Sequence, residues 1–140
     1  MNTLFMYRYR DASNYKRDGN VIFSGEYVPN NHLSRLYAAF SQHAMFIAHQ
    51  IGVPELFFWH VGYDIENDDH CWHEFDCLNT TDHEPTDQRT IEEFVRDAER
   101  AAASGWLMWK PNHELRPSLN VEIPQGERFS MDRHDVSLRV

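Results

Sequence analysis

The densest set of chemically active side chains lies near the middle of the chain, between Asp68 and Cys77. It offers His, Cys, Asp and Glu, which are the common types of metal ligand. If this segment is a strand, alternation divides its side chains between two faces, with His70, Trp72, Glu74 and Asp76 on one and Cys71, His73, Phe75 and Cys77 on the other. Because the ligands are split in this way and no helical HExxH motif accompanies them, we predict no metal site.

The same segment could supply the groups of a small hydrolase, with His70, His73, Glu74 and Asp76 as its working residues. Paired carboxylates on an exposed strand face are more often solvated than catalytic, and nothing assigns an acid role to one and a base role to the other. The sequence contains no GxSxG, Walker or GxGxxG motif. We therefore predict a protein without catalytic residues or cofactors, and keep the hydrolase as an alternative.

A second group is formed by Arg89, Arg96 and Arg100. Arg96 and Arg100 are four residues apart and share one face of a predicted helix. One interpretation is a solvated face on which Glu92 pairs with Arg96. The other is a phosphate clamp, since planar guanidinium groups make charge-assisted bonds to phosphate.

The segment before these arginines favours the clamp. Trp72 and Phe75 offer aromatic faces for a purine, and Asn79 offers an amide for its polar edge. Together with arginines for the phosphates, these are the parts of a nucleotide site. We predict a ligand-binding site made of Trp72, Phe75, Asn79, Arg96 and Arg100, with either aromatic residue as the stacking ring.

Composition limits the partners. A formal charge of −9 opposes broad contact with a nucleic-acid polymer or an anionic membrane, and no window approaches the length of a membrane span. Cys71 and Cys77 cannot form a disulfide framework, and the N-terminal residues do not read as a signal peptide, so we expect a reducing cytosol. Aromatic residues make up 14% of the chain, more than one small core readily hides, which predicts a homo-oligomer.

The first elements are read from periodicity. Leu4–Arg10 alternates as a half-buried strand, and Val21–Phe23 follows as its antiparallel partner after a loop of about ten residues. Apolar residues from Leu33 to Ile51 recur at steps of three and four, which predicts an amphipathic helix ending at Gly52, with a possible break near Ser41–Ala44.

The second half of the chain is again predicted to form two strands followed by a helix. Leu56–Val61 and His70–Leu78 are expected to form a second hairpin. Thr90 and Glu93 form a capping box for a helix that carries an apolar stripe of Ile91, Phe94, Val95, Ala98 and Ala102 and stops at Gly105.

Beyond Trp106 the pattern weakens. Leu119–Ile123 could be a strand, and Arg128–Val140 is expected to be irregular or docked on a neighbouring subunit. The order ββαββα predicts an α+β fold, an antiparallel sheet with two helices on one face. Residues 1–111 would form the ligand-binding domain and residues 112–140 a C-terminal extension.

In chain size, element order and the set Asn79, Arg96 and Arg100, the chain resembles the first Thoeris anti-defence family. These are small phage proteins that sequester cyclic ADP-ribose isomers made by bacterial immune sensors. The resemblance implies a non-enzymatic sponge in the cytoplasm of the infected bacterial host, assembled as a symmetric oligomer with pockets between subunits. It also implies that the helix arginines can hold cyclic oligonucleotides.

Two alternatives remain at this point. One is the small hydrolase, which would degrade such a messenger instead of storing it. The other is a protein-binding inhibitor of a bacterial defence complex, whose acidic surface would mimic nucleic acid.

Overall fold

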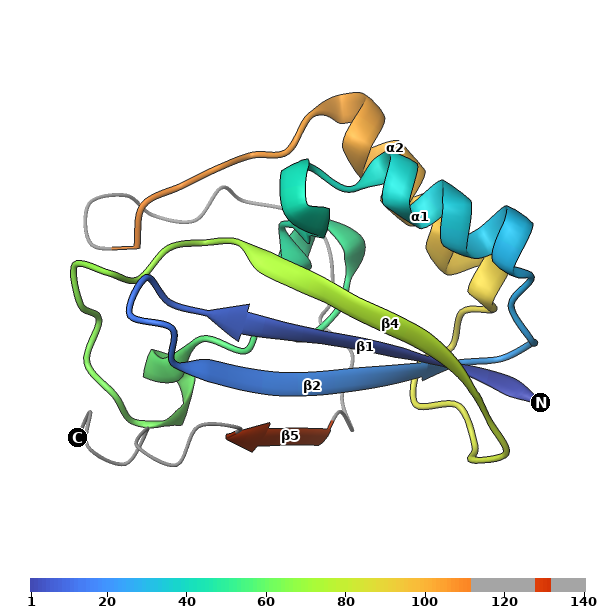
Figure 1. Cartoon of the computed structure of the whole chain (residues 1–140), viewed down its shortest axis with the longest axis horizontal. Coiled ribbons are helices and arrows are strands. Elements are labelled where there is room, and N and C mark those ends of the chain that lie inside the picture. Colours follow the sequence, from blue (N-terminus) through green and yellow to red (C-terminus); the bar gives the residue numbers. More distant parts are fainter. Residues whose placement is uncertain (112–127, 132–140) are drawn as a thin grey trace.

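The computed structural model describes residues 1–111 and 128–131, and its helices cover one face of an antiparallel sheet (Figure 1). The strands lie in the order β3-β4-β1-β2-β5. Their bounds are β1 Asn2–Arg10, β2 Lys16–Phe23, β3 Met45–Phe46, β4 His73–Thr81 and β5 Arg128–Met131. The helices are α1 Ser34–Ala39 and α2 Ile91–Ser104, and single turns of helix occur at Pro29–Leu33, Gln42–Ala44, Ala48–Ile51 and Phe58–Val61. The predicted α+β class is confirmed.

Strand β1 lies at the centre of the sheet and has the predicted alternation. Phe5, Tyr7 and Tyr9 are at most 1% exposed, whereas the residues between them are half-buried. The predicted loop of about ten residues is wrong, because β2 begins at Lys16 and pairs with β1 along its whole length. The first half of β2 is polar, so its sequence lacks the apolar alternation that identifies a strand.

The helix predicted from Leu33 to Ile51 is interrupted, close to the break that the sequence allowed. Helix α1 stops at Ala39, and Phe40 is extended with a ψ of 153°. The ring of Phe40 stacks on Phe46, whose short strand β3 pairs with the start of β4. These apolar residues therefore reach the core from several short elements, and helical spacing alone could not distinguish that arrangement from one helix.

The turn before β3 has a left-handed backbone at two residues that are not glycine, with φ of 59° at His43 and 58° at Ala44. This conformation costs an L-residue about 1 to 2 kcal/mol. We expect Ala44→Gly to raise the free energy of unfolding in urea by about 0.5 kcal/mol, because relief of strain exceeds the entropy gained by the unfolded chain. The same change at exposed, helical Ala38 should lower it by about 1 kcal/mol. Equal losses at both positions would contradict this account of the turn.

The predicted strand Leu56–Val61 does not form. Its buried backbone groups bond to side chains instead of a neighbouring strand. Nη1 of Arg17 donates to the carbonyl of Phe57 at 3.1 Å, and the Leu56 N–H donates to Nε2 of His73 at 2.8 Å. A short apolar run fits a buried loop as well as a strand, so the second hairpin was a wrong prediction.

Strand β4 starts at His73, three residues later than predicted, and contains a bulge. Its register on β1 shifts, so that Met6 pairs with Cys77 whereas Tyr7 pairs with Phe75. Asp76 is the extra residue, and Cys77 therefore lies on the opposite face from Phe75. The prediction that Cys77 and Phe75 share a face was wrong, because alternation cannot anticipate a bulge.

Helix α2 matches its prediction closely. The Thr90–Glu93 capping box is present in both directions, and the helix ends at Gly105. Ala101, and not the predicted Ala102, completes the buried stripe. Phe94 anchors the helix on the sheet, stacking on Phe23 at 4.2 Å between ring centroids.

The end of the chain is described only at Arg128–Met131. This segment forms β5, which pairs with Arg17–Asn20 of β2 in the same chain. The expectation of an irregular tail was wrong for these residues, which are too few to show a period. The predicted strand Leu119–Ile123 lies outside the described residues. No helix in the described part of the chain has the length and apolar character to cross a membrane.

Candidate functional site

The predicted ligand-binding residues do not converge on one place. Phe75 is 7% exposed and stacks on Phe5 at 5.4 Å, so its ring belongs to the core. Asn79 is exposed on the other face of β4, where its amide lies 3.5 Å from the sulfur atoms of Met6 and Cys77. The bulge at β4 separates these two residues.

The helix arginines also lie apart from the aromatic residues. The side chain of Arg96 is 63% exposed, and its Nε donates to Glu92 at 2.9 Å. Arg100 is 72% exposed and pairs with Asp97. Both residues thus make the contacts of a solvated helix face.

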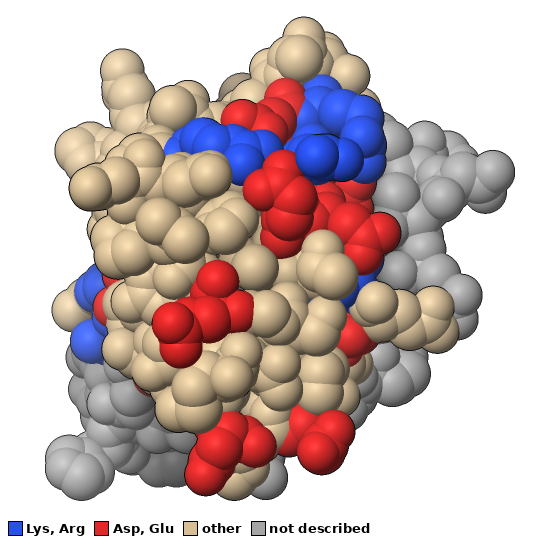
Figure 2. Space-filling view, turned by 90° about the vertical axis from the view of Figure 1, so that its right-hand side faces the viewer, with Lys and Arg blue, Asp and Glu red and all other residues tan. Residues whose placement is uncertain are grey.

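Carboxylates accompany the basic groups over the helices. Figure 2 shows Lys and Arg side chains gathered at the top of one face, with Asp and Glu side chains beside and below them. Arg35 of α1 binds two glutamates of α2, Glu92 at 2.9 Å and Glu99 at 2.7 Å. Hydrogen bonds from Arg35 lower the pKa of Glu92 to about 2. This network joins the two helices, and its cations are already paired.

Arg89 is the most enclosed of the predicted arginines. Its guanidinium donates to Asp87 and Asp97 and to the carbonyls of Ile51 and Gly52, all within 3.0 Å. Burial lowers its pKa, but the hydrogen bonds and charges of the two aspartates outweigh burial and raise it. A pocket of about 370 Å³ lies beside Arg89 and Arg100. Because the Arg89 donors are bonded within the chain, we assign Arg89 a structural role.

Among the groups of the alternative hydrolase, His73 lies in the core, whereas Glu74 and Asp76 both contact Arg8 outside it. His73 is fully buried, and burial lowers its pKa to about 3, so its ring is neutral. Glu74 pairs with Arg10 at 2.8 Å on the other face of β4, and Asp76 pairs with Arg8 at 3.0 Å. These three side chains do not surround a common substrate position.

Three carboxylates, those of Asp11, Asp68 and Asp69, approach within 4.8 Å of one another beside the turn that follows β1. Each accepts a hydrogen bond from its surroundings. Asp11 accepts from the N–H of Tyr15, Asp68 from the hydroxyl of Ser13, and Asp69 from the hydroxyl of Tyr9. The bond from Ser13 joins the two loops, and the bond from Tyr9 ties the second loop to β1, so we interpret the cluster as structural acceptors, not as metal ligands.

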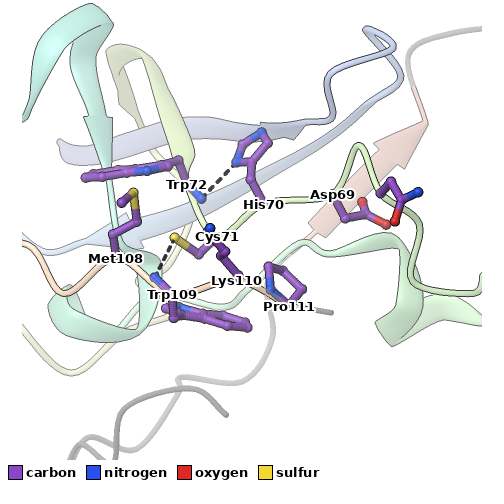
Figure 3. A pocket seen from close by; sticks show the side chains of 9 residues that line it. Asp69, His70, Cys71, Trp72, Met108, Trp109, Lys110 and Pro111 are labelled. Carbon is purple, nitrogen blue, oxygen red and sulfur yellow. Dashed lines mark hydrogen bonds between the residues drawn. The ribbon is translucent and has the colours of Figure 1, made fainter. Parts of the chain in front are cut away.

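Trp72 lines a different pocket, which none of the other four predicted site residues lines (Figure 3). The cavity measures about 340 Å³, within the usual range for a small-molecule site. Its lining comes from the segment before β4 and from the segment after α2: Asn67, Asp69, His70, Cys71, Trp72, Met108, Trp109, Lys110 and Pro111. In Figure 3 the indole rings of Trp72 and Trp109 lie on opposite sides of Cys71.

Two adjacent residues hold the backbone at both tryptophans. Nδ1 of His70 accepts from the N–H of Trp72 at 3.0 Å, and Sγ of Cys71 accepts from the N–H of Trp109 at 3.4 Å. Both bonds are drawn in Figure 3. The pocket is therefore assembled by side chains of His70 and Cys71, although its walls are far apart in the sequence.

The indole N–H of Trp109 is buried and has no hydrogen-bond partner among the described residues. A buried donor left in this condition costs about 1 to 3 kcal/mol, which an acceptor from a ligand would offset. Exposed Lys110 follows Trp109 and brings a positive charge to the rim. The sequence prediction missed both residues, although Trp106, Trp109 and Lys110 form a short aromatic and basic run.

Comparison with protein-family models, with curated proteins and with solved structures finds no match for this chain.

Proposed function

We propose that the protein is a non-enzymatic binder of a small cyclic nucleotide, held in the pocket between Trp72 and Trp109. The observation that carries the proposal is a cavity of about 340 Å³ that combines two indoles, a lysine and a buried indole N–H for which the described residues supply no acceptor. An aromatic face suits a base, an N–H donor suits its polar edge, and an ammonium group suits a phosphate.

Each residue then has a distinct task. Trp72, which is half-buried, stacks on the base, and stacking of this kind contributes about 1 to 3 kcal/mol. Trp109 donates its indole N–H to an acceptor on the ligand. Its exposed neighbours Met108 and Lys110 must shift to let the ligand reach that donor, and Lys110 then contacts a phosphate oxygen. Phe75, Asn79, Arg96 and Arg100 are left out of this site.

The biological role is taken from the resemblance in chain size and element order, because the site proposed here leaves out Asn79, Arg96 and Arg100. We propose that the ligand is a cyclic ADP-ribose isomer and that the protein is phage-encoded and silences bacterial immune signalling by storing this messenger in the host cytoplasm. A separate site for cyclic oligonucleotides and assembly into a homo-oligomer stay predictions. Effective storage needs nanomolar affinity, equivalent to about −12 kcal/mol.

Titration calorimetry with cyclic ADP-ribose isomers tests the proposal. We expect saturable binding with one ligand per pocket, whereas the absence of heat with any isomer would contradict it.

A chelator is expected to leave this binding unchanged, because the proposed contacts come from the indoles of Trp72 and Trp109 and from the ammonium group of Lys110. None of these contacts requires a metal ion. Titrations with and without EDTA should give the same dissociation constant. A loss of affinity in EDTA that zinc restores would show instead that a metal holds the ligand.

A further inference from the structure

We propose that His70 is the positioning residue of the Trp72–Trp109 pocket, and that the pocket keeps its shape only while the His70 ring is neutral. The geometry of its two nitrogens carries the inference. Nδ1 faces the backbone N–H of Trp72 at 3.0 Å, and Nε2 faces the carbonyl oxygen of Arg10 at 2.6 Å.

These partners define a single tautomer. The Trp72 N–H is a donor, so Nδ1 must be the acceptor and carry no proton. The Arg10 carbonyl is an acceptor, so Nε2 must carry the proton. A proton on Nδ1 would place two donors against each other, and the bond that fixes the Trp72 backbone would be lost.

The ring has little freedom to avoid this conflict. The ring of Tyr9 packs against the ring of His70, with centroids 5.2 Å apart. The Tyr9 hydroxyl accepts a hydrogen bond from the backbone N–H of His70 at 3.2 Å. The same hydroxyl donates to Asp69, which also lines the pocket. The backbone and the ring of His70 are thus both tied to β1, and Trp72 is tied to His70.

Charged and titratable groups surround His70 on every element that packs against it. They are Tyr9, Arg10 and Asp11 on β1 and the turn after it, Asp68 and Asp69 just before His70 in the sequence, His73 and Glu74 on β4, and Lys110 across the pocket. The Arg10 guanidinium is bonded to Glu74 and Asn14, and His73 is neutral. Neither therefore competes for the two nitrogens of His70.

Two substitutions separate the bonds of the ring. In His70→Asn the amide oxygen can occupy the place of Nδ1 and accept from Trp72, but it does not titrate. In His70→Gln the amide reaches the place of Nε2 and can donate to Arg10, but the acceptor for Trp72 is lost. The variants differ little in size, so each is the matched control of the other.

The first measurement needs no ligand. It is the protection of the Trp72 amide against hydrogen exchange at about pH 7.5 and about pH 5.5, corrected for intrinsic exchange, since histidine ordinarily changes charge in this interval. We expect protection in the native protein to fall about tenfold at the lower pH. His70→Asn should keep its protection at both values, and His70→Gln should lack it at both. Equal pH dependence in the native protein and His70→Asn would overturn the proposal.

The second measurement rests on the proposed function and uses cyclic ADP-ribose as the probe. Affinity should fall about tenfold at about pH 5.5 in the native protein and stay constant in His70→Asn. If the amide results hold and no nucleotide binds, the positioning role stands and the proposed ligand is wrong. If His70→Gln fails to fold, the comparison of the native protein with His70→Asn still decides.

Discussion

Replacing Arg89 with Met is expected to lower the free energy of unfolding by about 3 to 5 kcal/mol, measured in urea. The side chain is 19% exposed, and its partner Asp87 is 5% exposed. Methionine keeps most of the apolar stem, and it removes the guanidinium, which lies 5.3 Å from the ring centroids of Phe23 and Phe94. The loss would therefore report the charge and its bonds, because two aspartates and two backbone carbonyls lose the guanidinium that donates to them.

Arg96→Met and Arg100→Met are the matched controls on the same helix. Each of these arginines is more than 60% exposed and forms one ion pair with a neighbour in α2, so each change should cost at most about 0.5 kcal/mol. A loss at Arg89 no larger than at these positions would refute the structural role that we assign to it.

Replacing Trp72 with Ala is expected to weaken the binding of cyclic ADP-ribose about ten- to hundredfold in calorimetric titration, since it removes the stacking surface. Trp72→Phe should recover much of the affinity, because a smaller ring can still stack. Circular dichroism should show folded protein in both cases, as Trp72 is only half-buried.

The double variant Arg96→Ala, Arg100→Ala is the control for this experiment, and it should bind the same ligand at full strength. Both arginines are exposed on α2 and do not line the pocket. Loss of binding in the double variant, with full binding in Trp72→Ala, would return the site to the helix arginines and contradict the proposed pocket.

Secondary structure was predicted best where the spacing of the apolar residues, or that spacing together with capping residues, indicated a single element. In β1 the alternation of Phe5, Tyr7 and Tyr9 coincides with their burial. In α2 a capping box, an apolar stripe and a terminal glycine all mark the same helix. Both elements lie within the sheet and helix layers, where one face is buried along the whole length.

Prediction from the sequence failed where contacts with distant residues determine the backbone conformation. Leu56 and its neighbours are buried, but distant side chains, among them His73, satisfy their backbone groups, and no local pattern encodes that. The bulge at Asp76 reversed the faces of the residues after it and so separated Phe75 from Asn79. The pocket was found only in part, because Trp109 and Lys110 follow the last predicted helix and meet Trp72 only in the folded chain.

The most direct test of the central claim is to incubate the protein with cyclic ADP-ribose, remove unbound ligand, denature the complex by heat and record the mass spectrum of what is released. We expect the unaltered cyclic nucleotide, in an amount close to one molecule per pocket, from the native protein and from Arg96→Ala, Arg100→Ala, and little from Trp72→Ala. Release of a linear or otherwise altered product would contradict storage and support the hydrolase instead, and release of equal amounts from Trp72→Ala would contradict the pocket.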